Sequence, residues 1–133
     1  MTLLFVTVFA YGNSNECLKY EPTVVQLLGT IEIITYPGPP NYEDIKAGDI
    51  PEACAFLVLE SPICVADDSK SDINTEREVN QSRVQLVPSD SVRNFKTYAD
   101  GKRYRLAGTL FHAFTGHHRA AILMVVKTIE VVG

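Results

Sequence analysis

Residues 23–35 constrain the fold more than any other part of the chain. They read TVVQLLGTIEIIT, a long run of β-branched and apolar residues with Gly29 in its middle. This composition predicts a strand, and a glycine inside a strand marks a bend or a bulge. A long strand bent at a glycine is what a small β-barrel requires, because that strand pairs with two neighbours around a corner.

Four further segments have the character of strands. They are residues 56–65, which Pro62 interrupts, and residues 83–87, 104–114 and 120–129. Residues 107–110 (AGTL) echo residues 28–31 (LGTI), again with a glycine inside a strand. We therefore expect two strands that bend at equivalent corners of a barrel.

Residues 88–101 are predicted to form a helix. Ser89 or Asp90 can cap its start, and Gly101 can adopt the left-handed conformation that ends a helix. Val92, Phe95 and Ala99 share the spacing of one helical face. The predicted order is therefore three strands, a helix and two strands.

This order is that of the OB-fold, a five-stranded, partly open Greek-key barrel with one helix between strands 3 and 4. We expect residues 17–131 to form a single OB-like β-barrel domain. An OB-fold holds ligands with one face and with the loops that join strands 1–2 and 4–5. Here those loops are the proline-rich residues 36–52 and the histidine-bearing residues 115–119.

The N-terminal residues favour export. Residues 3–10 are an uncharged apolar run, and a polar stretch follows at residues 12–16. We expect residues 1–12 to be a signal peptide, truncated or beginning upstream because no Lys or Arg stands near Met1. The alternative is a buried first strand. No other apolar stretch approaches the roughly 20 residues of a membrane-spanning helix, so we expect no integral membrane segment and a periplasmic or secreted protein.

The chain has three cysteines, at positions 17, 54 and 64. Paired cysteines persist in the oxidising compartments that exported proteins enter. We expect Cys17 to pair with Cys64, and Cys54 to remain free as a small buried hydrophobic residue. No Cys-x-x-Cys or His-x-x-x-His spacing indicates a zinc site.

The net charge of the chain limits the classes of partner that it can bind. The chain carries 12 basic and 16 acidic residues, which argues against nucleic acid as a partner. Residues 1–70 have a net charge of −7, whereas residues 71–133 have a net charge of +3. An anionic ligand is therefore expected to favour the second half of the domain. The alternative is that both halves are simply solvated faces.

The two loops supply the candidate ligand-binding residues, each with a structural alternative. Tyr36 and Tyr42 flank the prolines of the first loop, where they can stack on a ligand or stiffen the loop. His117, His118 and Arg119 lie in the second loop. They can contact an anionic or carbohydrate group, or the histidines can bond to backbone groups and organise the turn.

A metal site is a further hypothesis for the histidines. Imidazole suits zinc, copper and nickel. Adjacent residues of an extended chain point to opposite faces, so only His112 with one of His117 and His118 could share an ion. The strongest candidates are His112 and His117, with a third ligand from Glu43, Asp44 or Asp49.

No arrangement of residues points to catalysis. The serines lack a nucleophile-elbow motif, and nothing near Cys54 supplies a base. Carboxylate pairs such as residues 43–44 and 67–68 lie in polar loops, where their pKa values are expected to be ordinary. We expect neither an enzyme nor a cofactor.

The chain also resembles a family of small exported bacterial proteins, defined as a domain of unknown function, DUF4431. The resemblance covers roughly residues 17–130. It rests on the segments CLKYEP (17–22), YPGPPNYE (36–43), PICV (62–65), VQL (84–86), GTLF (108–111) and TGHH (115–118). It implies export and supports the pairing of Cys17 with Cys64, and it brings no activity or catalytic residue. The family pattern has a histidine where Arg119 stands here, which weakens the metal hypothesis.

These observations predict a non-enzymatic, exported binding module. Its expected partner is an envelope protein, a small ligand or an oligosaccharide. A specific form is an inhibitor or immunity-type protein that acts on an envelope enzyme. The alternative is a periplasmic metal-binding protein that uses the histidine hairpin.

Overall fold

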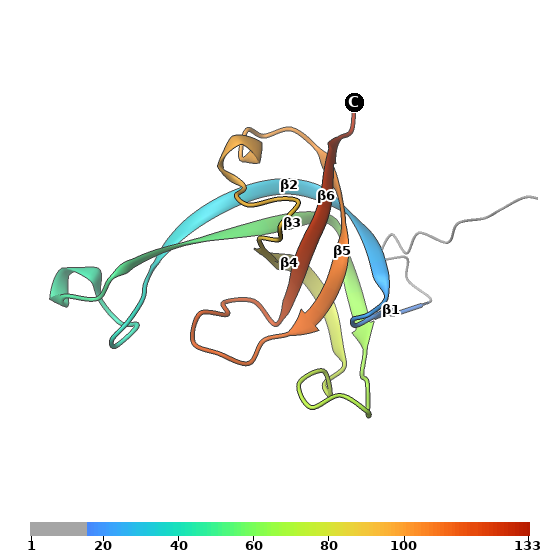
Figure 1. Cartoon of the computed structure of the whole chain (residues 1–133), viewed down its shortest axis with the longest axis horizontal. Coiled ribbons are helices and arrows are strands. Elements are labelled where there is room, and N and C mark those ends of the chain that lie inside the picture. Colours follow the sequence, from blue (N-terminus) through green and yellow to red (C-terminus); the bar gives the residue numbers. More distant parts are fainter. Residues whose placement is uncertain (1–15) are drawn as a thin grey trace, which may run out of the picture.

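The computed structural model describes residues 16–133, so the expected signal peptide at residues 1–12 lies outside the described range. Five long strands form a closed barrel and one short strand is added to it (Figure 1). The strands are β1 (Leu18–Lys19), β2 (Val24–Pro37), β3 (Pro51–Ala66), β4 (Glu78–Val87), β5 (Tyr104–His112) and β6 (Ile122–Val131).

The strand pairing is that of an OB-like barrel. Strand β2 pairs antiparallel with β3 and with β5, β3 pairs antiparallel with β4, and β5 pairs antiparallel with β6. Strand β4 pairs in parallel with β6, which closes the ring. The mainly β prediction is therefore confirmed, but the barrel is closed rather than partly open.

The helix predicted over residues 88–101 is wrong. Within residues 16–133, this region contains only a three-residue 3-10 turn, η2 (Lys96–Tyr98). Oγ of Ser89 donates a hydrogen bond to the Val126 carbonyl in β6 and accepts one from the Val92 amide, which holds the chain in an irregular path. Phe95 is buried in the core from this path, so the apolar spacing is satisfied without the cost of nucleating a helix.

The two glycines inside strands lie where the barrel bends, as predicted. At Gly29, β2 exchanges β5 for β3 as its neighbour, and a Cβ atom there would lie 2.1 Å from the Val58 carbonyl oxygen. A Cβ atom at Gly108 would lie 2.1 Å from the Val125 carbonyl oxygen. The register of β5 on β6 shifts between Ala107 and Gly108. Both positions require glycine because neighbouring backbone occupies the space of a side chain.

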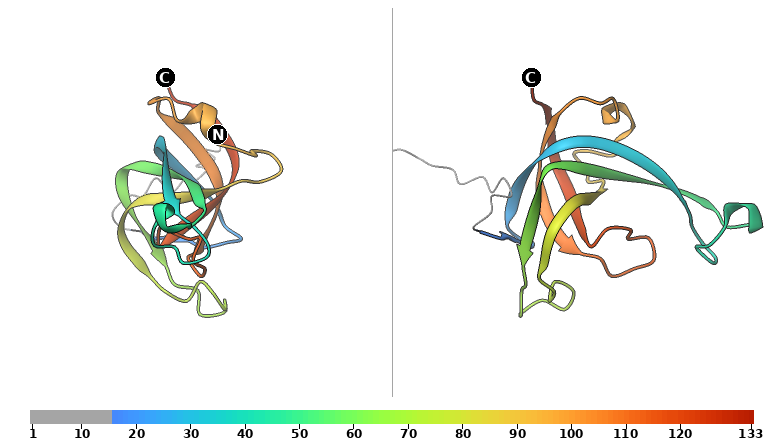
Figure 2. Two further views of the ribbon diagram at one scale, coloured as in Figure 1. Left: turned by 90° about the vertical axis from the view of Figure 1, so that its left-hand side faces the viewer. Right: turned by 180° about the vertical axis from the view of Figure 1, so that it is seen from behind.

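The core fills the barrel, while one hairpin extends beyond it. Each barrel strand contributes fully buried side chains to the core, such as Leu27, Leu57, Val84, Leu106 and Met124. The outer parts of β2 and β3 pair with each other and project from the barrel (Figure 2). The tip of this hairpin carries the 3-10 turn η1 (Ile45–Ala47). The hairpin forms one side of the candidate site.

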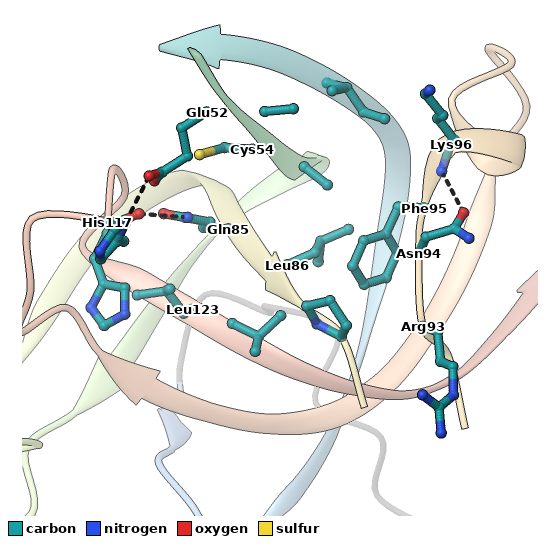
Figure 3. Close-up of a pocket in the computed structure, with 16 residues that line it drawn as sticks. Glu52, Cys54, Gln85, Leu86, Arg93, Asn94, Phe95, Lys96, His117 and Leu123 are labelled. Atoms are coloured by element: carbon teal, nitrogen blue, oxygen red, sulfur yellow. Dashed lines mark hydrogen bonds and ion pairs between the residues drawn. The ribbon is translucent and has the colours of Figure 1, made fainter. Parts of the chain in front are cut away.

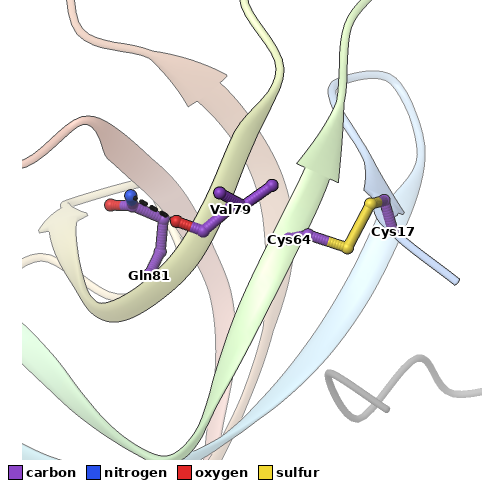
Figure 4. The surroundings of a disulfide bond; sticks show 4 residues. All are labelled: Cys17, Cys64, Val79 and Gln81. Atoms are coloured by element: carbon purple, nitrogen blue, oxygen red, sulfur yellow. Dashed lines mark hydrogen bonds between the residues drawn. A yellow bond between two sulfur atoms is a disulfide. The ribbon is translucent and has the colours of Figure 1, made fainter. Parts of the chain in front are cut away.

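The disulfide prediction is confirmed. Cys17 and Cys64 are bonded, with their Cα atoms 4.6 Å apart (Figure 4). Beside the disulfide, β1 pairs in parallel with the end of β3, and Leu18 lies opposite Val65. Cys54 is free and buried, as expected. No helix within residues 16–133 has the length and apolar character needed to cross a membrane.

Candidate functional site

The two predicted ligand-binding loops, residues 36–52 and 115–119, contact each other in the structure. Nη1 of Arg119, in the β5–β6 loop, donates to Oε1 of Glu52 at 2.5 Å, and Nη2 donates to the Pro37 carbonyl at 3.0 Å. The guanidinium centre lies 4.8 Å from the ring centroid of Tyr36 and 5.8 Å from that of Tyr42. Arg119 thus binds the β5–β6 loop to the outer end of the β2–β3 ladder, where Tyr36 pairs with Glu52.

His117 strengthens the same contact. Its Nδ1 atom lies 2.8 Å from Oε2 of Glu52, and its Nε2 atom lies 3.3 Å from the Tyr42 hydroxyl. Gln85 of β4 donates to the His117 carbonyl at 3.0 Å and accepts from the Arg119 amide at 2.5 Å. We call Tyr42, Glu52, Gln85, His117 and Arg119 the clamp, because together they fix the β5–β6 loop against the hairpin and β4.

The charges of the clamp stabilise one another. Burial alone would raise the pKa of Glu52, but hydrogen bonds from Arg119 and His117 outweigh it and lower that pKa. Burial likewise would lower the pKa of Arg119, and the bond to Glu52 reverses this effect and raises it. Glu52 and Arg119 therefore both remain charged at neutral pH.

A pocket of about 460 Å³ lies beside the clamp, between the hairpin, β4 and the β4–β5 loop (Figure 3). Glu52 and His117 lie at one end of it, and Arg93 and Lys96 lie at the other. Its walls between these ends are mainly apolar and include Ile33, Ala53, Ala55, Leu86, Val87, Pro88, Phe95 and Leu123. An apolar pocket with a few polar groups at its ends has the composition of a ligand-binding site.

Cys54 also lines this pocket, but its thiol is held in the unreactive form. The residue is only 5% exposed. Burial raises the pKa of the thiol and outweighs the opposite effect of Arg119, whose Nη1 atom lies 3.5 Å from Sγ. The thiolate is the nucleophilic form of cysteine, so Cys54 is disfavoured as a nucleophile at neutral pH.

His118 lines the pocket as well, and its ring organises the turn. Nδ1 of His118 accepts hydrogen bonds from the amides of Phe114 and Thr115, at 2.9 and 3.2 Å. The ring packs edge-on against Phe111 and Phe114. Burial, followed by the nearby His117, lowers its pKa. These contacts fit the alternative in which His118 bonds to backbone groups and organises the turn.

The predicted metal ligands are not brought together. Nε2 of His112 lies 2.7 Å from Oε2 of Glu78, whereas His117 contacts Glu52. Asp49 accepts hydrogen bonds from the backbone amides of residues 41, 43 and 44, and so closes the hairpin tip. Asp44 caps the 3-10 turn η1. The hairpin carboxylates therefore hold the backbone of their own loop.

Four residues around the pocket were not predicted as site residues: Glu52, Gln85, Arg93 and Lys96. Gln85 had a detectable signal, because it is a polar residue in the middle of the apolar strand segment VQLV. Arg93 and Lys96 fall within residues 88–101, for which a helix was predicted that does not form. Glu52 carried no signal of its own, since its role depends on a partner 67 positions away.

Residues 83–130 match the model of DUF4431, a domain of unknown function. The match is to the family that the sequence resembles. The matched range runs from Arg83 in β4 to Glu130 in β6, and includes the β4–β5 loop and the histidine hairpin. No curated protein and no solved structure matches the chain.

Proposed function

We propose that this protein is a non-enzymatic binding module of the cell envelope, periplasmic or secreted. Its pocket would hold a segment of another envelope protein. The observation that carries the proposal is the 460 Å³ pocket between the projecting hairpin and the β4–β5 loop. It lies beside the two loops that an OB-fold uses for ligands.

The pocket favours a ligand with an apolar body and an anionic group. The apolar walls would bury the body of the ligand, which supplies the main free energy of binding. Arg93 and Lys96 at the β4–β5 end would attract a carboxylate or another anion. At the other end, Glu52 and His117 already bond to each other, so they shape the pocket rather than offer free charges.

Exposed apolar residues near the pocket favour a protein as the partner. Ile45 and Ile50 are exposed on the hairpin, and Phe114 is exposed on the β5–β6 loop. Exposed apolar surface of this kind is typical of protein–protein contacts. The clamp fixes the hairpin before a partner arrives, which reduces the entropy lost on binding. A specific form of this function is an inhibitor or immunity-type protein that inserts its hairpin into an envelope enzyme.

Capture from an envelope extract tests the proposal with matched variants. Ala53 is exposed and lines the pocket, so Ala53→Trp fills the pocket; Thr128→Trp adds the same bulk on β6 outside it. Lys96→Glu reverses a pocket charge, and Lys127→Glu reverses an exposed charge on β6.

We expect the wild type, Thr128→Trp and Lys127→Glu to recover the same partner, which Ala53→Trp and Lys96→Glu lose. Circular dichroism would verify that every variant is folded. Recovery of no protein, or equal recovery by all the variants, would contradict the proposal.

A further inference from the structure

A second cluster of polar side chains lies outside the pocket, where the β3–β4 loop meets the end of β5. His112 is the last residue of β5, Glu78 is the first residue of β4, and Glu76 precedes it by two positions. Nε2 of His112 lies 2.7 Å from Oε2 of Glu78 and 3.5 Å from Oε2 of Glu76. One ligand atom of each residue lies within 4.8 Å of the other two.

The imidazole of His112 is oriented for ligation. Its Nδ1 atom lies 2.9 Å from the Ala113 carbonyl oxygen, which can only accept a hydrogen bond, so Nδ1 carries a proton. Nε2 then faces carboxylate oxygens, which are also acceptors. This contact requires either a proton on Nε2 or a metal cation between Nε2 and the carboxylates. A histidine held through one nitrogen by a backbone carbonyl is the arrangement seen at metal centres. The amide of His112 is bound as well, by Oδ1 of Asn74 at 2.8 Å.

The cluster suits a cation and is open to solvent on one side, at Glu76. The His112 and Glu78 side chains are only 14% and 22% exposed, whereas Glu76 is 69% exposed. Within residues 16–133, His112 is the only cationic group in an ion pair with either carboxylate. The two negative charges of the carboxylates therefore exceed the single positive charge of an imidazolium. Glu76 can change its rotamer at the surface to admit an ion.

We propose that Glu76, Glu78 and His112 form a site for a divalent transition-metal ion, with Zn²⁺ as the best fit. Zinc with bonds of about 2.0–2.1 Å in a tetrahedral site separates its ligand atoms by about 3.3 Å. The 3.5 Å between His112 and Glu76 is close to that value, and the 2.7 Å contact to Glu78 needs to open by about 0.6 Å. Water would be the fourth ligand. The ion would tie the start of β4 to the end of β5.

This site differs from the one that the sequence favoured, because it takes its carboxylates from the end of the β3–β4 loop and the start of β4, and excludes His117. It also shares no residue with the pocket. Its failure would therefore leave the proposed binding function untouched.

Isothermal titration calorimetry of the untagged, chelator-treated protein with ZnCl₂ tests the site. We expect one Zn²⁺ per chain, a higher melting temperature with the metal, and an absorption band of bound Co²⁺ when cobalt replaces zinc. Glu76→Gln and Glu78→Gln are each expected to weaken binding at least tenfold. Glu130→Gln, an exposed carboxylate on β6, serves as the matched control and is expected to bind as the wild type does.

Glu76 is exposed, so Glu76→Gln leaves the fold intact and keeps the test decisive. Absence of saturable binding would overturn the proposal, as would wild-type affinity in both glutamine variants. A loss of affinity in His117→Gln, with none in Glu76→Gln, would also overturn it and would place the ion at the histidine hairpin.

Discussion

Nη1 of Arg119 lies 2.5 Å from Oε1 of Glu52, and this ion pair joins the β5–β6 loop to the outer end of the β2–β3 ladder. The two side chains are 11% and 23% exposed, so water screens the pair only in part. Glu52 also lines the pocket. The pair therefore holds one end of the pocket and limits the movement of the hairpin.

Replacing Glu52 is expected to destabilise the protein. Glu52→Gln leaves the guanidinium of Arg119 largely shielded from water and without its counter-ion, which we expect to lower the free energy of unfolding by about 1–3 kcal/mol. Urea denaturation followed by circular dichroism measures this change. Glu130→Gln removes the carboxylate of the more exposed pair with Arg105, and we expect about 0.5 kcal/mol or less. Equal losses in the two variants would contradict the role of the clamp.

The contribution of Glu52 should disappear in acid. Hydrogen bonds lower its pKa in the folded protein, so its carboxylate stabilises the fold above the ordinary glutamate pKa of about 4.3. This contribution is lost as the pH falls through the lower pKa of the folded state. The stability difference between the wild type and Glu52→Gln should therefore shrink as the pH falls below about 4.3. Urea titrations over this range test the prediction, and a difference that grew toward low pH would oppose it.

Local signals in the sequence were enough to predict most of the barrel. The glycines at positions 29 and 108 marked the bends because only backbone fits beside them. The prediction of a helix over residues 88–101 was wrong because apolar spacing has two possible explanations. The spacing of Val92 and Phe95 satisfies a helix, but an irregular segment also buries them when Ser89 holds the chain to β6. Periodicity does not distinguish these two cases.

The candidate site could be predicted in part. The OB-fold assigned Tyr36, Tyr42, His117 and Arg119 to its two ligand-binding loops, and in the structure these four residues contact one another. The pairing of His112 with Glu76 and Glu78 was missed, because it depends on where a polar loop without a clear pattern crosses the end of β5. Contacts of this kind depend on the path of the backbone through the loop, and residue types alone do not determine that path.

Substitution of Gly29 tests the bend of the barrel. A Cβ atom at this position would lie 2.1 Å from the Val58 carbonyl oxygen, and backbone cannot move aside without breaking strand pairing. We expect Gly29→Ala to lower the free energy of unfolding by more than about 2 kcal/mol. Gly133→Ala is the control, because nothing lies within 4 Å of its new methyl group. A stable Gly29→Ala variant with the wild-type melting temperature would refute the proposed bend.

The disulfide is expected to contribute strongly to stability. It links residues 47 positions apart, and closing a loop of that length stabilises the fold by about 4 kcal/mol on the chain-entropy model. A double variant, Cys17→Ser with Cys64→Ser, should show this loss in urea denaturation and should no longer respond to reductant. Cys54→Ala should still lose stability when reductant is added. Insensitivity of the wild type to reductant would argue against the bond.

The most direct test of the binding function is photo-crosslinking from the pocket. A photoreactive amino acid at position 53, in cells of the native host, places the probe among the pocket residues; the same probe at position 128 is the control on β6. We expect one discrete protein adduct from position 53, which Lys96→Glu abolishes, and none of that mass from position 128. No protein adduct from position 53, or the same adduct from both positions, would contradict it.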